Sequence, residues 1–268
     1  MTDPGTENVG EGFSQTAVDY DEAVRHNIAG AQRLVAAIPA GEYRDVLDVG
    51  CGTGFSAEAM ADRFGPVRLT GVDPAEGMLD QFRAKLDGRP DIEATLHAAD
   101  VMSMPVPDEA FDAVICAMAF HWFPFKSAAM REMARTLRPG GVLAILCSGT
   151  GGEVEFQRLL SRLEPGVPTW VGAFESLQRD IPDMEGYLDG AGLDPVDVWM
   201  ERRIRRTDPF AYMERMRVVA GHITAGGTDE DRESLERRVD DALQGAVDGQ
   251  GRFRYTFNKL FTIARKPA

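Results

Sequence analysis

Three glycines at alternate positions, Gly50, Gly52 and Gly54, directly follow 46–49, a short run rich in β-branched and aliphatic residues. Glycine is needed where a turn takes a positive φ or where a ligand lies against bare backbone. A second strand-like run, 67–72, ends in Asp73, the position at which nucleotide-binding α/β proteins place an acid on ribose hydroxyls. The pair predicts a site for a nucleoside-containing ligand at the ends of two strands.

The spacing of these glycines argues against two other nucleotide sites. A phosphate-binding P-loop requires Lys and then Ser or Thr after its last glycine. A dinucleotide-binding loop requires its third glycine further along the chain. Phe55 and Ser56 stand at these positions, so neither site is expected.

The stretch 117–125 follows another apolar run and is rich in aromatic residues. Phe120 and Trp122 are predicted to line a substrate pocket, where a ring can face a cationic ligand. His121 lies between them and is the candidate general base. An equally supported interpretation makes the rings an anchor for the next helix and His121 a satisfied polar core residue.

The composition of the 268-residue chain limits its partners. A net charge of −14 argues against nucleic acid, which normally needs a basic face. No apolar run reaches membrane-spanning length, and the acidic, glycine-rich start lacks the features of a secretion signal. The three cysteines fall in or beside predicted strands without metal-site spacing. We expect a cytoplasmic protein without a metal, monomeric or homodimeric.

Alternating strand and helix patterns position the candidate residues. They predict strands at 45–49, 67–72, 92–97, 111–117 and 141–147 and helices at 54–64, 75–87 and 124–137. Such alternation indicates a parallel sheet covered by helices on both faces, with ligands at the carboxyl ends of its strands. Two more strands, near 196–200 and at 252–264, complete seven strands, with the last antiparallel.

The chain divides into four predicted segments. Residues 1–12 form a disordered tail, and 13–147 form the core with an N-terminal lid helix at 13–38. The Gly- and Pro-rich insert 148–195 has helical pieces at 153–163 and 184–191, and long inserts at a ligand edge are typically lids. Residues 196–268 complete the sheet and add helices at 208–222 and 229–246.

The core resembles the class I S-adenosylmethionine (SAM) dependent methyltransferases. The resemblance covers about residues 44–147 and rests on Asp48-Val49-Gly50-Cys51-Gly52-Thr53-Gly54, Gly71-Val72-Asp73-Pro74 with Met78-Leu79, Ala99-Asp100 with Met104-Pro105, Phe111-Asp112-Ala113-Val114 and Leu137-Arg138-Pro139-Gly140-Gly141. It implies an α/β, Rossmann-like, mostly parallel seven-stranded sheet with a helical lid insert. It also implies SAM as cofactor and S-adenosylhomocysteine as product.

The same resemblance implies which residues contact SAM. The cofactor-binding positions are Asp48, Gly50, Cys51, Gly52, Asp73, Pro74, Met78, Asp100, Val101 and Ala117. Asp73 would accept hydrogen bonds from both ribose hydroxyls, a charge-assisted arrangement, or cap the helix that follows. Asp100 would accept a hydrogen bond from the adenine amino group.

The outer segments are similar to the carboxyl methyltransferases that esterify malonyl carrier protein or trans-aconitate. The similar parts are Phe13 to Asp21, His121-Trp122 and the ending 251–265. In such enzymes the N-terminal helix closes over SAM, which implies that Tyr20 lies near the ligand. An acid substrate also needs cations. These are available in Arg202, Arg203, Arg205 and Arg206, unless the four residues only face solvent at the end of a strand.

The sequence thus predicts a SAM-dependent methyltransferase of a small-molecule or carrier-protein-bound metabolite. The expected reaction is in-line transfer to oxygen, either of a carboxylate or of a hydroxyl. C- or N-methylation in a biosynthetic pathway stays open, as does a SAM-binding cyclase or isomerase without methyl transfer. A binding protein with a degenerate site is disfavoured because both Asp73 and Asp100 are present.

Overall fold

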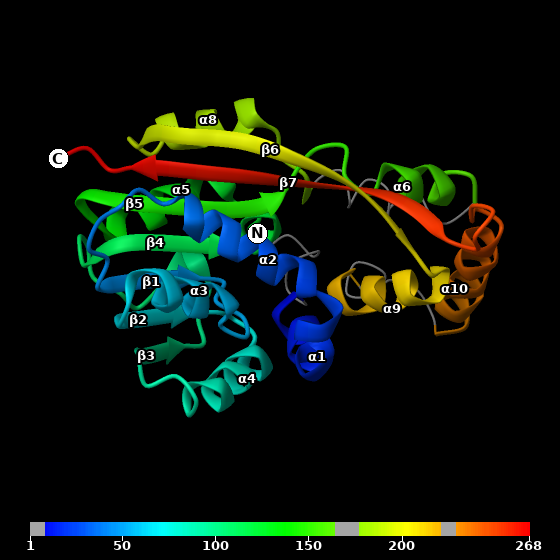
Figure 1. The fold of residues 1–268 in the computed structure, drawn as a ribbon, viewed down its shortest axis with the longest axis horizontal. Coiled ribbons are helices and arrows are strands. Elements are labelled where there is room, and N and C mark those ends of the chain that lie inside the picture. Colours follow the sequence, from blue (N-terminus) through cyan, green and yellow to red (C-terminus); the bar gives the residue numbers. More distant parts are fainter. Residues whose placement is uncertain (1–8, 164–176, 221–228) are drawn as a thin grey trace.

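The computed structural model describes residues 9–163, 177–220 and 229–268. They form a seven-stranded sheet in the order β3-β2-β1-β4-β5-β7-β6 (Figure 1). Its strands are β1 (Asp45–Val49), β2 (Val67–Val72), β3 (Ile92–His97), β4 (Phe111–Ala117), β5 (Leu137–Ser148), β6 (Asp194–Thr207) and β7 (Phe253–Arg265). Strands β1 to β5 are parallel, and β7 is antiparallel to both its neighbours. The predicted fold class is confirmed.

Helices cover both faces because the central strands are apolar on both sides. In β1, Val46 packs into one core cluster and Leu47 into the other, as alternating side chains require. Helices α2 (Arg25–Ala37), α3 (Phe55–Phe64) and α4 (Glu76–Leu86) pack into the first cluster, and α5 (Lys126–Thr136) and α8 (Ile181–Asp189) into the second. None of the described helices is long and apolar enough to span a bilayer.

The predicted helix 13–38 is in fact two helices. Helix α1 covers Val9–Ala23, and α2 begins at Arg25, because Val24 has a φ of −113° and a ψ of 23°, outside the helical region. Residues 9–12, predicted as part of a disordered tail, belong to α1. Because of this break, α1 has its own direction and packs against α4 and α9 (Pro209–Ala220).

A third apolar core lies beside the sheet. It joins α6 (Val154–Leu160), α9, α10 (Asp229–Gln244) and the first half of β7, which lie together at one end of the molecule (Figure 1). Tyr212 meets Phe156 and Phe253 edge to face in this core. Helix α8 instead buries Met184 and Leu188 against the sheet. The two described helices of the 148–195 insert therefore belong to different cores, and α6 forms a helical subdomain with two helices from 196–268.

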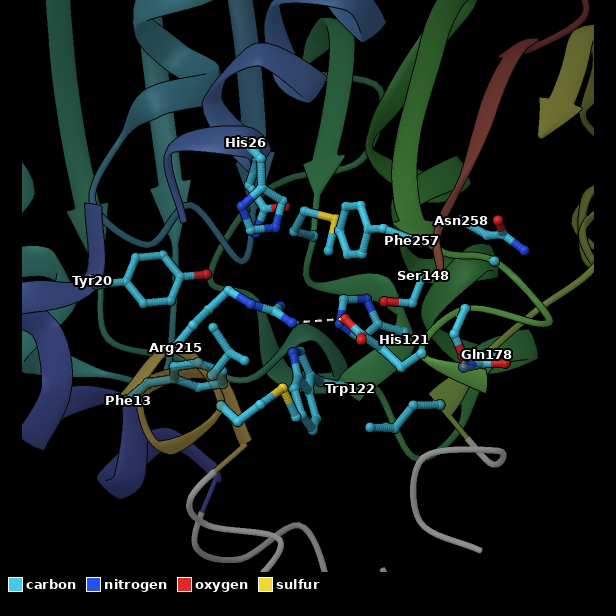
Figure 2. A pocket seen from close by; sticks show the side chains of 18 residues that line it. Phe13, Tyr20, His26, His121, Trp122, Ser148, Gln178, Arg215, Phe257 and Asn258 are labelled. Carbon is cyan, nitrogen blue, oxygen red and sulfur yellow. Dashed lines mark hydrogen bonds and ion pairs between the residues drawn. The ribbon is translucent and has the colours of Figure 1, made fainter. Parts of the chain in front are cut away.

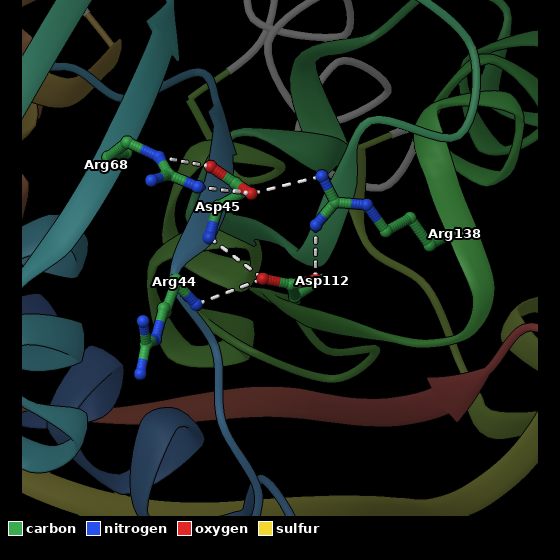
Figure 3. Close-up of polar contacts among 5 residues, drawn as sticks. All are labelled: Arg44, Asp45, Arg68, Asp112 and Arg138. Carbon is green, nitrogen blue, oxygen red and sulfur yellow. Dashed lines mark hydrogen bonds and ion pairs between the residues drawn. The ribbon is translucent and has the colours of Figure 1, made fainter.

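Charged residues from four strands hold the amino-terminal edge of β1 (Figure 3). Asp112 accepts hydrogen bonds from the backbone N–H groups of Arg44 and Asp45 at 3.0 and 2.9 Å. Arg68 binds both carboxylate oxygens of Asp45 at 2.7 and 2.8 Å, and Arg138 bridges Asp45 and Asp112. The bonds from Arg68 and then Arg138 keep the pKa of Asp45 below its usual value. Asp112 and Arg138 belong to the motifs shared with the methyltransferase family, and their contacts here stabilise the sheet.

Removal of the Asp112 carboxylate should destabilise the fold. In Asp112→Ala, two backbone N–H groups lose their acceptor and Arg138 keeps only Asp45, so the free energy of unfolding should fall by about 1–3 kcal/mol. Denaturant unfolding followed by circular dichroism measures this change. The control Asp80→Ala removes an exposed acid paired with Arg83 and should shift stability by less than about 0.5 kcal/mol. Equal stability of the two variants would contradict the role given to Asp112.

Candidate active site

A cavity of about 570 Å³ lies at the carboxyl ends of β1, β2 and β4. Val49, Val72 and Ala117 line it from these strand ends, and Gly10, Phe13 and Tyr20 line it from α1. Ligands of parallel α/β sheets bind at this edge, and the volume is in the range of nucleotide and drug-sized ligand sites.

The glycine loop forms the floor of this cavity. Gly50 has a φ of +69°, and a Cβ there would lie 2.2 Å from Cβ of Ala119. A Cβ on Gly52 would meet nothing within 4 Å, so this residue presents bare backbone. The N–H groups of Gly50 and Cys51 donate to the carbonyl of Val72 at 2.7 and 3.2 Å. The loop is therefore tied to the end of β2.

Asp73 secures the same loop through its side chain. One carboxylate oxygen accepts from the Gly52 N–H at 2.9 Å, and the other accepts from the Ala75 N–H at 2.9 Å. The side chain lies in the cavity wall with 9% of the residue exposed. Burial raises the pKa of Asp73 to about 6, although the two hydrogen bonds act to lower it. Each oxygen keeps a lone pair for a ligand.

The other predicted cofactor residues divide into two groups. Pro74, Met78, Asp100, Val101 and Ala117 line the cavity with Gly50, Gly52 and Asp73. Asp48 and Cys51 do not line it. Asp48 is fully buried beneath the loop, where it accepts from the Ser56 hydroxyl at 2.6 Å, and the Cys51 sulfur packs toward Gly71. Both therefore act on the loop from below.

Helix α1 covers the glycine loop. Asp21 accepts a hydrogen bond from the Thr53 hydroxyl and pairs with Lys85 of α4. Tyr20 lies in the cavity wall, and burial, followed by the charges of Asp73 and Asp21, raises the pKa of its phenol well above 10. The structure thus places Tyr20 at the predicted site.

The chain is similar to known methyltransferases. A family model described as a methyltransferase domain matches residues 46–141. The trans-aconitate 2-methyltransferase of Delftia acidovorans is 30% identical over 257 residues, covering 88% of this chain and 93% of that protein. The chain is a class I SAM-dependent methyltransferase. The malonyl-[acyl-carrier protein] O-methyltransferase of Hahella chejuensis is 35% identical over 140 residues, which cover 52% of the present chain and 48% of that protein.

A solved structure agrees with the fold of this methyltransferase. The phosphoethanolamine N-methyltransferase 2 of Haemonchus contortus, in complex with SAM, superimposes with a TM-score of 0.60 at 17% identity. The match covers 100% of the present chain and 61% of the other. At this identity the likeness concerns the fold alone.

The large cavity of the methyltransferase fits SAM, the cofactor that the family implies. Gly52 leaves room for close approach to backbone, Asp73 supplies a carboxylate at the end of β2, and Met78 and Pro74 supply apolar surface. Within the described residues, no group of three His, Cys, Asp or Glu side chains is arranged to hold a metal ion.

A second cavity of about 80 Å³ adjoins the first. Phe13, Tyr20, Met118 and Trp122 line both cavities and form the wall between them. Met118 has a φ of +62°, and such strain in a non-glycine residue is typical of functional sites. Phe120, predicted as a substrate residue, lines neither cavity and is fully buried against Phe123 and Tyr187. The prediction that Phe120 lines a substrate pocket is therefore wrong, because its side chain is buried in the core and does not reach either cavity.

Arg215 is the central residue of the second cavity and was missed by the sequence analysis. It reaches from α9 into the cavity (Figure 2), and its guanidinium pairs with Glu153 at 2.8 Å. Glu153 also accepts from the Tyr212 hydroxyl at 2.7 Å. One signal was available: Arg215 falls on the apolar stripe of α9 between Tyr212 and Met216, where a charged residue needs a reason.

Buried polar atoms without hydrogen-bond partners gather around this cavity. Within the described part of the chain, four such atoms belong to residues that line it: Asn27 Oδ1, His121 Nδ1, Arg215 Nε and Asn258 Oδ1. Buried polar groups are nearly always paired in folded proteins. The second cavity is therefore suited to a polar ligand.

His121 is buried at the second cavity. Burial lowers the pKa of His121 to about 3, assisted by the nearby charges of Lys126 and Arg179. These two cations donate hydrogen bonds to the carbonyls of Phe123 and Gln178. The imidazole is neutral at pH 7 and accepts a proton poorly.

Asp73→Ala should weaken SAM binding, because it removes the carboxylate expected to bind the ribose and one hydrogen bond to the glycine loop. We expect a loss of about 10- to 100-fold in affinity, from charge-assisted bonds of about 1.5–3 kcal/mol, measured by calorimetry. Glu93→Ala, an exposed acid on β3, controls for the lost charge. An unchanged affinity in Asp73→Ala would rule out this assignment.

The pH dependence provides an independent check on Asp73. Its pKa of about 6 means that the carboxylate is ionised at pH 7 and becomes protonated as the pH falls below 6. SAM affinity should therefore decrease between pH 7 and pH 5, and Asp73→Ala should lack this decrease.

Proposed function

We propose that this methyltransferase esterifies a carboxylate of a small or carrier-bound metabolite. The supporting observation is the second cavity, where unpaired polar atoms and the cationic side chain of Arg215 lie directly beside the large cavity. The names of its relatives, trans-aconitate 2-methyltransferase and malonyl-[acyl-carrier protein] O-methyltransferase, agree with an acid acceptor.

SAM bound in the large cavity would supply a methyl group already activated by a sulfonium. Asp73 would accept hydrogen bonds from the ribose hydroxyls, and Asp100 from the adenine amino group. The backbone of Gly50 and Gly52 would lie against the methionine part, with Pro74, Met78, Val101 and Ala117 along the ring and ribose.

The acceptor would lie in the second cavity. The Nε–H of Arg215 is free to donate to an acceptor oxygen, although the other end of the guanidinium is paired with Glu153. Lys126 and Arg179 do not line the cavity but lie near His121, and after burial their charges also lower the pKa of that residue. With three cations near one acid, the cavity favours an anion.

The state of His121 favours a carboxylate over a hydroxyl acceptor. A general base works best when its pKa lies near the working pH, and that of His121 is about 3. A carboxylate is already ionised at pH 7 and needs no base. We therefore assign His121 a hydrogen-bonding role toward the acceptor, in place of the predicted base.

The wall between the cavities would align the two reactants. Phe13, Tyr20, Met118 and Trp122 are in position to exclude water and to fix the line of attack. Alignment of this kind can supply on the order of 7–11 kcal/mol of rate enhancement. Aromatic faces are also favourable neighbours for a sulfonium charge.

Product analysis tests this proposal. The protein is incubated with SAM carrying a labelled methyl group and a panel of carboxylic acids that includes trans-aconitate, with matched alcohols and amines. We expect label in an alkali-labile methyl ester together with S-adenosylhomocysteine. Label in an ether or amine would overturn the choice of acceptor. A changed product without S-adenosylhomocysteine would point to a cyclase or isomerase.

Arg215→Gln should impair use of the acid and leave SAM binding intact. Loss of its donor should raise KM for the acid about 10- to 100-fold, as expected for a buried charged hydrogen bond. The control Arg217→Gln changes a cation of the same helix that pairs with Glu214 and Asp240 and should keep KM. Equal KM in both variants would contradict acceptor binding by Arg215.

A further inference from the structure

A third cavity, of about 180 Å³, lies between α2 and the strands β6 and β7. Four cationic residues line it: Arg33, Arg203, Arg205 and Lys259. Glu201 is the one acidic residue among its described lining residues, and it pairs with Arg33 and Arg203. A local excess of positive charge on a chain of net charge −14 is a feature that solubility does not explain.

Lys259 is the most unusual member of this group. Only 7% of the residue is exposed, and its ammonium donates to the backbone carbonyl of His26 at 2.6 Å. Burial lowers the pKa of Lys259 to about 7, with Arg205 and Arg33 adding to the effect and Glu201 opposing it. Burial of an ammonium that is bonded only to a neutral carbonyl carries a desolvation cost, which a bound anion would offset.

The neighbouring helix is shaped to admit this ammonium. A Cβ on Gly30 of α2 would lie 2.3 Å from Nζ of Lys259. Glycine inside a helix costs about 1 kcal/mol relative to alanine. The glycine therefore makes room for the Lys259 ammonium, which forms no ion pair within 4.0 Å among the described residues.

The third cavity borders the second one. His26 and Phe257 line both, and their rings meet edge to face with centroids 4.7 Å apart. Burial lowers the pKa of His26 to about 2, and Arg215 on one side and Lys259 and Arg205 on the other add to this effect. A neutral ring pair thus separates two cationic sites.

We propose that this cavity is a second ligand site, which binds the carboxylate or phosphate group of an anion through Arg205 and Lys259. Arg203 and Arg205 lie two residues apart on β6, so their side chains share one face. Phe257 and Phe261 add apolar surface at the same place, which suits the carbon part of an organic anion. The site is distinct from the acceptor cavity and does not depend on the proposed esterification.

Calorimetry with inorganic phosphate and with phenyl phosphate at constant ionic strength tests this site. We expect saturable binding of both probes, weakened about tenfold in Arg205→Gln and in Lys259→Met. Arg202→Gln changes an exposed arginine of the same strand that faces the other way and should keep wild-type affinity. SAM binding should be the same in all variants, which shows that each is folded. No saturable binding, or equal losses in Arg202→Gln and Arg205→Gln, would overturn the proposal.

The two probes distinguish the sources of the anion. Tighter binding of phenyl phosphate would support an organic anion that packs on Phe257 and Phe261. Equal affinity for both probes would support a site for a free inorganic anion. In either case the loss in Arg205→Gln is required.

Discussion

The glycine loop is held between the carbonyl of Val72 and the carboxylate of Asp73, and the active site depends on this arrangement. Two loop N–H groups donate to the carbonyl and a third donates to the carboxylate. Asp48 supports the loop from below through Ser56, and Asp21 of α1 binds Thr53 from the other side. The parallel sheet, the loop and the covering helix therefore form one continuous hydrogen-bonded unit around the large cavity.

Charge is distributed according to the chemistry that each cavity serves. The large cavity carries carboxylates that can accept from a neutral ribose and an amino group. The smaller cavity has Arg215, with Lys126 and Arg179 nearby, and a neutral His121. In the proposed esterification, this division would place the sulfonium electrophile and an anionic nucleophile on opposite sides of a shared wall. The strained backbone of Met118 lies in that wall, where both reactants would be aligned.

The sequence predicted β1, β2, β3 and β4 to the residue, because short runs rich in β-branched and aliphatic residues alternate with helical segments and are bounded by turns. It also placed Asp73 and Asp100 at the cavity, since position at a strand end decides their location. It could not give side-chain direction for Phe120 or Cys51, which depends on local turns. Glu153 and Arg215 lie 62 residues apart in sequence, and only packing of the helical subdomain brings them together.

The most direct test of the two-cavity account is a crystal structure of the protein with S-adenosylhomocysteine. The account predicts adenosine in the large cavity, ribose hydroxyls on Asp73, and the sulfur facing Met118 and Trp122 toward the second cavity. A sulfur directed away from that wall, or a ribose bound away from Asp73, would contradict it.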